Sequence, residues 1–486
     1  MDKGRVYNYL FKSILGFVFL TGILLRSVTY LYNRSFWHDE ASLALSIIRD
    51  VNLFTPLPHN QFAPQLFLFS TKILSIIFSC SEMVLRFIPF IFGIFSIFIF
   101  YLLSKEFLQN KLSIIAANFL FAINYHIIYY CQEFKQYSTD VFFFMLALLI
   151  FSKIDFNKIN IKTYFLVGFI ILFSTMVSLS ILFVTAAWFC VGLLKHKLSA
   201  IKTFLKFTPY LIVFLIYYIF VLAPAQSNVE LGNLNYWDSG YLRLNLLYIL
   251  KLIKNCFEYC FTPNHYVLIS LIFSCFGWYF IAKNKEVKPL YSITFCAFLF
   301  VLLASFLHMY PLDGRAGLFL TPIVILTVII PLDRSKWYYL ILLLPLFIVN
   351  FSGYNFNYLK TFFNNNVFAF KNSREITKIL KDKFTEGDVV VYNIASDSDY
   401  EYYTHLLNLE IKNFVVLQLP NEDDKTKIEI LKNSLSYLQK GKYYIFYIGY
   451  DRQSKQELPL LKKWLADKNI IWEYDKNGSY IVKIKL

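Results

Sequence analysis

Apolar runs of helical length recur from residue 13 to residue 351, and they restrict the fold more than any other feature of the sequence. In lipid, backbone N–H and C=O groups find no water, so a segment that crosses a membrane satisfies them internally as an α-helix of about 20 residues. We expect eleven such spans, at residues 13–32, 87–104, 112–130, 140–152, 163–178, 180–195, 207–223, 265–282, 290–308, 316–331 and 337–351. The sequence therefore predicts a polytopic α-helical membrane protein.

Composition divides the chain into two parts. Hydrophobic residues make up 57% of the chain and charged residues 16%, but residues 352–486 hold 20 of the 47 Lys and Arg and 17 of the 32 Asp and Glu. Such a contrast separates an apolar membrane body from a water-soluble segment. We predict a membrane domain over residues 1–351 and a soluble domain over residues 352–486.

Positive charge in the membrane body gathers in loops. The net charge of the chain is +15, and subtracting the tail leaves 27 basic and 15 acidic side chains, or +12, in residues 1–351. The basic loops lie near residues 105–111, 153–162, 195–206, 283–288 and 334–336, on one side of the predicted spans together with the N-terminus. Because such loops face the cytoplasm, the charge indicates topology and not a nucleic-acid partner. We expect a plasma-membrane protein with a cytoplasmic N-terminus.

One apolar stretch, Phe62 to Ser79, is left outside the eleven spans. If it crossed the membrane, every later basic loop would face outward, and Lys72 in its middle would cost about 3 kcal/mol at mid-bilayer. We expect the stretch to lie at the interface, within a first exoplasmic loop of residues 33–86. Eleven spans that start inside then place the C-terminal domain on the exoplasmic side, periplasmic or extracellular.

The tail alternates between helical and strand-like patterns, which is typical of a small α/β domain. Helices are expected at Ser373–Lys383, Lys425–Lys440 and Leu458–Lys468, and strands at Asp388–Tyr392, Phe414–Leu419 and Tyr443–Tyr447. Asn477-Gly478 lies between two further strand-like runs, 470–474 and 480–484, and predicts a closing hairpin.

Two acidic clusters lie in the predicted exoplasmic loops. Trp37-His38-Asp39-Glu40-Ala41 places adjacent carboxylates just after the first span. Asp39 fits either a reactive carboxylate or the cap of a helix that starts near Ala41. Glu133 to Asp140 forms the second cluster, in which Glu133 and Lys135 fit either a site or an exposed ion pair, and Asp140 fits either a site or another helix cap.

A cation stands in a later exoplasmic loop, Pro311-Leu312-Asp313-Gly314-Arg315. An arginine that snorkels at a helix end explains Arg315 without a function. The predicted topology nevertheless sets all three clusters at one membrane face, as an active site requires. A carboxylate accepts a proton from an attacking hydroxyl, and Lys or Arg neutralises a departing phosphate.

Several motifs resemble, in their order and spacing, the GT-C superfamily of membrane glycosyltransferases. The branch concerned contains protein O-mannosyltransferases, the lipid A aminoarabinose transferase and related bacterial sugar transferases. The motifs are Arg26, Trp37 to Ala41, Pro58-His59, Phe62 to Pro64, Leu85 to Pro89, Phe92-Gly93, Glu133 to Ser138 and Tyr310 to Arg315. The resemblance covers residues 10–350 in organisation, and the first 150 residues carry the specific motifs.

The resemblance implies a role for each candidate residue. Asp39 matches the family's essential carboxylate, as the base or as a residue that helps hold a divalent cation such as Mg or Mn, with metal dependence left open. Glu40 lies beside it, and the second-loop acid matches Asp140 or Glu133. The resemblance implies that Lys135 and Arg315 bind the phosphate of the donor. His59 and Tyr137 are assigned to substrate binding, although His59 departs from the family's His-Pro-Pro element.

The implied activity is an inverting transfer of a hexose or pentose from a polyprenyl-phosphate carrier to an exoplasmic acceptor, which is a lipid, a cell-envelope glycan or a protein. Two alternatives stay open from the sequence alone. One is a lipid or polysaccharide transporter or flippase, which is also polytopic but usually places ionisable groups near mid-bilayer in paired repeats. The other is a non-catalytic relative that serves as a scaffold.

Overall fold

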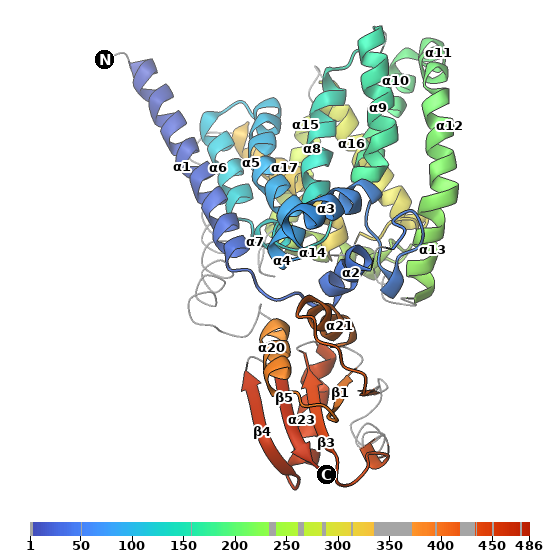
Figure 1. The fold of residues 1–486 in the computed structure, drawn as a ribbon. Helices are drawn as coiled ribbons and strands as arrows, with labels where there is room; N and C mark the ends of the chain where they lie inside the picture. The colour runs from blue at the N-terminus through green and yellow to red at the C-terminus, as the bar shows by residue number, and fades with distance from the viewer. Residues whose placement is uncertain are drawn as a thin grey trace.

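Helices of the N-terminal part coincide with ten of the eleven expected spans, and a five-stranded sheet follows at one end of the bundle (Figure 1). This computed structural model describes residues 3–49, 51–156, 158–232, 240–260, 267–283, 288–312, 314–334, 372–393, 396–417, 433, 435–449, 452–476 and 479–486. The expected span at 337–351 and the predicted boundary at 351/352 lie outside these ranges. Both stay predictions.

The bundle helices follow the apolar runs closely. They are α1 (Lys3–Leu31), α5 (Phe87–Phe107), α6 (Lys111–Ile123), α7 (Tyr125–Tyr130), α8 (Tyr137–Lys153), α9 (Ile161–Val177), α10 (Ser180–His196), α11 (Leu198–Lys206), α12 (Thr208–Tyr217) continued by η2 (Tyr218–Leu222) and α13 (Ala223–Gly232), α15 (Val267–Lys283), α16 (Pro289–Phe306), and α17 (Thr321–Asp333) preceded by η5 (Gly314–Leu320). Among the described helices, five segments are long and apolar enough to cross a membrane: Arg5–Leu31, Phe87–Phe107, Thr208–Ser227, Pro289–Phe306 and Gly314–Asp333. The protein is a helical membrane protein with several spans.

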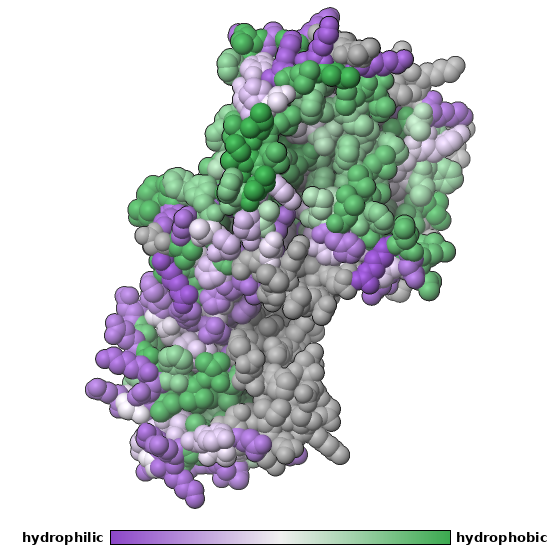
Figure 2. All heavy atoms as spheres, turned by 90° about the vertical axis from the view of Figure 1, so that its right-hand side faces the viewer, coloured by the Kyte–Doolittle hydropathy of each residue, from purple (hydrophilic) through white to green (hydrophobic). Residues whose placement is uncertain are grey.

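Packing within the bundle places α17 at its centre. Ile325, Leu326 and Val328 are fully buried. Gly277 of α15 lies so close to α17 that a Cβ there would stand 2.0 Å from the carbonyl oxygen of Thr327, so only glycine allows this approach. The outer helices expose their apolar side chains, and Figure 2 shows these covering the helical part, with hydrophilic side chains above and below them. Such a band suits contact with lipid tails.

Short helices of the first loop lie across the end of the bundle. They are α2 (His38–Ile48), η1 (Pro58–Asn60), α3 (Gln65–Phe78) and α4 (Glu82–Leu85). Figure 1 shows α3 running across the ends of the neighbouring helices rather than alongside them. This arrangement agrees with the expectation that Phe62 to Ser79 is not one of the spans.

The tail forms a mixed sheet with helices, as its sequence pattern predicted. Its elements are α20 (Ser373–Lys383), β1 (Val389–Asn393), α21 (Asp397–Leu406), β2 (Phe414–Leu417), β3 (Tyr443–Ile448), α23 (Arg452–Leu465), β4 (Asn469–Lys476) and β5 (Ser479–Lys485). The strand order is β2-β1-β3-β5-β4, in which β1 is parallel to β2 and β3, and β5 is antiparallel to β3 and β4. The predicted β4–β5 hairpin is present, although its turn residues and most of the expected helix Lys425–Lys440 lie outside the described residues.

Helix α21 was not predicted, and it joins the tail to the first loop. Its Tyr402 and Tyr403 are fully buried in an apolar cluster that includes Phe36, Phe67 and Phe134. The rings of Phe36 and Tyr402 lie 4.9 Å apart. The tail therefore packs against the same end of the bundle that carries the acidic motif.

Candidate active site

Helix α2 points its two adjacent acids in different directions. The helix begins at His38, and no side chain caps its N-terminus, so the reading of Asp39 as a helix cap is wrong. Asp39 instead accepts a hydrogen bond from Nη2 of Arg315 at 2.6 Å. Burial works against ionisation of this carboxyl, but Lys135 and Arg315 outweigh that effect and hold the pKa of Asp39 below its usual value. Successive helix residues are rotated by about 100°, so Glu40 faces elsewhere.

Glu40 lies at the centre of a closed buried network. Its carboxylate is fully buried and contacts Nη1 of Arg34 at 2.6 Å and Nε and Nη2 of Arg86 at 2.8 Å. It also accepts the backbone N–H of Phe134 at 2.8 Å. Burial disfavours the charge, yet the two arginines hold the pKa of Glu40 below its ordinary value. With these contacts made, Glu40 has the surroundings of a residue that positions others.

The loop between α7 and α8 carries an apolar side chain, Phe134, between two charged ones, Glu133 and Lys135. The ring of Phe134 packs into the apolar cluster, 5.7 Å from the ring of Phe67. Glu133 and Lys135 on either side are buried as well, so the reading of them as an exposed pair is wrong. The ammonium group of Lys135 donates to Oε1 of Gln61. Burial lowers the pKa of Lys135, and Asp39 opposes that effect.

Glu133 has little to compensate its burial. Neither carboxylate oxygen has a hydrogen-bond partner among the described residues, and Nη1 of Arg315 lies 3.9 Å from Oε1. Burial is the main reason that the pKa of Glu133 rises to about 7, and Glu40 adds to the rise while Arg315 opposes it. This carboxyl is therefore close to half protonated at neutral pH.

Arg315 links the first-loop and second-loop clusters. Its guanidinium lies over the rings of Trp37 and Tyr137, at 5.2 and 5.6 Å from their centroids. Only 13% of the side chain is exposed. A snorkelling arginine would extend toward water, so this reading fails. Asp313 of the same loop lies outside the described residues.

The charges of this cluster do not balance. Among the residues that the structure describes, it contains four cations and three carboxylates: Arg34, Arg86, Lys135 and Arg315, against Asp39, Glu40 and Glu133. With every group ionised one positive charge is left over, and protonation of Glu133 leaves two. A buried excess of positive charge favours an anionic ligand.

Two candidate residues form no hydrogen bond or ion pair with the charged side chains of the Asp39 cluster in the described part of the chain. Asp140 accepts a hydrogen bond from Oγ of Ser178 at 2.5 Å, and its backbone oxygen accepts one from Ser180. Helix α8 begins at Tyr137 and has no side-chain cap, so Asp140 does not cap it. His59 lies in η1 with φ at 55°, where its nearest charged groups include Asp397 of the tail. Burial lowers the pKa of His59.

Sequence reasoning missed several partners. Arg86 was noticed only within the Leu85 to Pro89 motif, whereas it binds Glu40, and Arg34 was not singled out. Trp37, which lies against Arg315, was noticed only as part of a motif, and Gln61, which accepts a hydrogen bond from Lys135, was not singled out. The one signal for Arg86 in the sequence was its place in the Leu85-Arg86-Phe87-Ile88-Pro89 motif.

The residues around Asp39 do not suit a divalent cation. One oxygen of Asp39 is bonded to Arg315, and Lys135 also acts on this carboxylate. Within the described part of the chain, no group of three or more His, Cys, Asp or Glu side chains is arranged to hold a metal ion. We derive no step through a metal.

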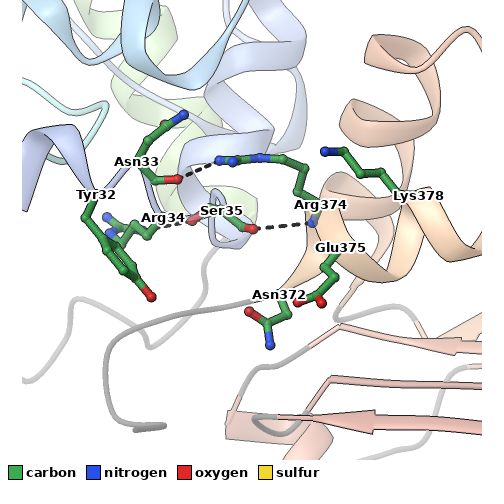
Figure 3. A pocket seen from close by; sticks show the side chains of 8 residues that line it. All are labelled: Tyr32, Asn33, Arg34, Ser35, Asn372, Arg374, Glu375 and Lys378. Carbon is green, nitrogen blue, oxygen red and sulfur yellow. Dashed lines mark hydrogen bonds between the residues drawn. The ribbon is translucent and has the colours of Figure 1, made fainter. Parts of the chain in front are cut away.

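A pocket of about 250 Å³ lies between the first loop and α20 (Figure 3). Its walls are formed by Tyr32, Asn33, Arg34, Ser35, Asn372, Arg374, Glu375 and Lys378. Behind this wall, Arg34 pairs with Glu40 and Arg374 pairs with Glu82.

Comparison with known proteins identifies the fold. No family model and no curated protein matches the sequence. Two crystal structures of ArnT from Cupriavidus metallidurans match it at 10% identity over 99% of this chain and 98% of theirs, with TM-scores of 0.52 for the form bound to undecaprenyl phosphate and 0.56 for the apo state. The chain has the ArnT fold. Since ArnT is a GT-C lipid A aminoarabinose transferase, the resemblance drawn from the motifs is confirmed at the level of fold.

Proposed function

We propose that this chain is a glycosyltransferase that moves a hexose or pentose from a polyprenyl-phosphate carrier to an acceptor hydroxyl. The observation that carries the proposal is the Asp39–Arg315 pair, set in a cluster with excess positive charge. The ArnT fold, which has been solved with undecaprenyl phosphate bound, supports a donor of this class.

Arg315 and Lys135 bind the donor phosphate in this mechanism. Arg315 donates a hydrogen bond to Asp39. The phosphate of the donor is a diester with one negative charge, and its two free oxygens accept two parallel hydrogen bonds from a guanidinium as a carboxylate does. Donor binding therefore competes with Asp39 for Arg315. Loss of that cation raises the pKa of Asp39 and makes it a better base at the moment when the donor is in place.

Transfer then proceeds in one displacement. The acceptor oxygen forms a bond to the anomeric carbon while its proton passes to Asp39. The bond from the anomeric carbon to the phosphate oxygen breaks, and its electron pair stays on polyprenyl phosphate, whose charge Arg315 and Lys135 stabilise. In-line attack inverts the anomeric configuration. Phosphate is a stable anion, so the leaving group needs no general acid.

The remaining candidate residues have supporting roles. Glu40 fixes the α2 start and the second loop through Arg34, Arg86 and the N–H of Phe134. Glu133 shares the charge of Arg315 with Asp39, and Tyr137 supports the guanidinium face. Asp140 and His59 are assigned to contacts with the sugar or the acceptor.

The location of the cluster favours a transferase over a transporter. Asp39, Glu133 and Arg315 come from segments at the ends of helices, not from the middle of spans. We place this end and the tail on the exoplasmic side of the plasma membrane, with the N-terminus in the cytoplasm, as the basic loops indicate. The acceptor is then a lipid, glycan or protein of the cell envelope.

The proposal is tested by comparing cells with and without the gene. Mass spectrometry of their envelope lipids, glycans and proteins should show one sugar modification that disappears with the gene and returns when it is restored. Membranes that contain the protein should also release polyprenyl phosphate from the matching lipid-linked sugar. Identical envelope profiles together with no release would refute the transferase assignment.

A further inference from the structure

A second buried acid, Glu82 of α4, connects the membrane part to the tail. Its side chain is 4% exposed. Nε of Arg374 in α20 lies 2.6 Å from Oε1, and the hydroxyl of Tyr403 in α21 donates to the same oxygen at 2.9 Å. Both groups come from the C-terminal domain. The sequence gives no hint of this pairing, because Glu82 and Tyr403 are 321 positions apart.

Tyr403 and Arg374 also hold the segment that leads into α2. The hydroxyl of Tyr403 accepts the backbone N–H of Phe36 at 2.7 Å. Nη2 of Arg374 donates to the carbonyl oxygen of Asn33 at 2.7 Å, as Figure 3 shows. The backbone N–H of Arg374 donates to Oγ of Ser35 at 3.3 Å. The residues just before His38, where α2 begins, are thus fixed by the tail.

Further contacts run along α2 itself. Oγ of Ser42 donates to Oγ of Ser398 at 2.7 Å. Arg49, just past the end of α2, forms an ion pair with Glu401 of α21. Helix α21 therefore contacts α2 from Ser42 to just past its end. Asp39 lies about one turn before Ser42.

The tail uses a particular end of its sheet for this contact. Strands β1 and β3 are parallel neighbours whose connections leave toward opposite sides, and α/β domains usually bind ligands at the carboxyl ends of such strands. Here Gly449 after β3 and Ser396 after β1 are in contact, since the N–H of Gly449 donates to Oγ of Ser396 at 2.8 Å. Helix α21, which follows β1, packs against α2.

We propose that the C-terminal domain is part of the Asp39 site, in which Tyr403 and Arg374 are positioning residues that set the orientation of α2. The expected effect of these residues on catalysis rests on the proposed transferase function, whereas their expected effect on the mobility of residues 33–48 does not. Removing the Tyr403 hydroxyl leaves the N–H of Phe36 without its acceptor and Glu82 with one partner fewer. The α2 start then becomes more mobile, and Asp39 meets the acceptor in the right place less often.

The experiment compares Tyr403→Phe with Tyr400→Phe. Both changes remove one hydroxyl from the same helix, but the Tyr400 hydroxyl has no hydrogen-bond partner among the described residues and its ring stacks on Tyr392 within the tail. Hydrogen exchange is measured on the full chain in nanodiscs, over peptides that cover residues 33–48. We expect Tyr403→Phe to speed exchange there by about threefold to tenfold, and Tyr400→Phe to leave it unchanged.

Kinetics with a lipid-linked donor give the second readout. Tyr403→Phe should lower kcat by about tenfold to a hundredfold while KM for the donor stays within about twofold, because the phosphate ligands are untouched. Tyr400→Phe should match the wild type in both constants. Equal exchange and equal kcat in the two variants would overturn the positioning role.

The two proposals fail in different ways. If the wild type transfers no sugar but Tyr403→Phe still speeds exchange at residues 33–48, the transferase assignment fails and the contact stands. If Tyr403→Phe does not fold, Arg374→Gln and Arg374→Lys replace it. Arg374→Lys keeps the charge toward Glu82, so it should recover part of the kcat that Arg374→Gln loses, and equal kcat in these two variants would refute the role.

Discussion

Asp39 and Glu40 are neighbours in the sequence, yet the structure gives them opposite surroundings. Glu40 is fully buried, and two arginines and one backbone N–H saturate its carboxylate. Asp39 is partly exposed, and its hydrogen bond comes from Arg315. A second anion can bind Arg315 in its place. A rotation of one helix residue thus separates a group that holds the loops together from the one that we propose reacts.

The comparison also explains why an acidic pair, and not a single acid, occupies this position. An isolated carboxylate at the start of α2 would need its own support to stay in place. Glu40 supplies that support by joining Arg34 and Arg86 from the first loop to Phe134 of the second. The site is preorganised by one acid and completed by the other.

Glu40→Gln should have the largest effect on stability. It leaves Arg34 and Arg86 buried with reduced compensation, and removal of one partner of a buried ion pair costs about 3 to 5 kcal/mol. Thermal or denaturant unfolding in detergent measures the change. Asp39→Asn, the matched control one residue away, should unfold close to the wild type. If both variants unfold alike, the contrast between the two acids is lost.

Arg315→Ala and Lys135→Ala should each slow transfer by roughly a hundredfold or more, because one donor to developing charge is worth about 3 to 4 kcal/mol in the transition state. Steady-state kinetics in nanodiscs, with donor varied and acceptor fixed, should show the loss mainly in donor use. Lys158→Ala, which removes a cation that is 84% exposed in another loop, should match the wild type. Near-normal kinetics for both site variants would remove the phosphate clamp from the mechanism.

Glu133→Gln tests the pH dependence of donor binding. Burial raises the pKa of Glu133 to about 7, so its negative charge appears as pH rises from 6 to 8 and weakens the attraction for phosphate. The KM for donor in the wild type should therefore rise over this range by roughly threefold to tenfold, equivalent to about 1 kcal/mol. In Glu133→Gln it should change much less. The same rise in both proteins would show that another group titrates.

Titration of Glu133 should also make the folding stability of the protein depend on pH. The folded pKa of Glu133 lies above its unfolded value near 4.3, so the folded state binds more protons than the unfolded state between about pH 4.3 and 7. Stability of the wild type relative to Glu133→Gln should fall as pH rises through that window and then level off. A relative stability that rises with pH would contradict the raised pKa.

The reactivity of cysteines introduced at positions 39 and 40 should show the smallest difference between the two acids. In a background without reactive native cysteines, Asp39→Cys should react partly with an impermeant thiol reagent and Glu40→Cys should not. Tyr437→Cys, at a tail position that is 86% exposed, should react from the exoplasmic side in intact spheroplasts, and Lys158→Cys only after lysis. Protection of Tyr437→Cys before lysis would overturn the proposed orientation and the count of eleven spans.

Sequence reasoning succeeded where one local property decides structure. Apolar length located the helices, and alternation with an Asn-Gly turn located the β4–β5 hairpin. It also placed Asp39, Glu133, Lys135 and Arg315 at one end of the bundle, because loop charge fixes which helix ends lie together. None of these steps required a contact between distant residues.

The failures have the opposite character. Nothing local distinguishes Asp39 from Glu40, because their roles depend on Arg34 and Arg86, which reach Glu40 from outside α2. Helix α21 was missed because its Tyr-rich sequence has weak helix propensity, and burial of Tyr402 and Tyr403 against the first loop compensates. These features belong to tertiary packing.

The central claim is that Asp39 reacts while its neighbour holds the structure, and Asp39→Asn tests it most directly. The wild type and Asp39→Asn are purified into nanodiscs and given the cognate lipid-linked sugar and acceptor, and single-turnover transfer and unfolding are measured on the same samples. The account predicts that Asp39→Asn transfers no detectable sugar while its unfolding transition stays at the wild-type position. Transfer at the wild-type rate by Asp39→Asn would contradict it.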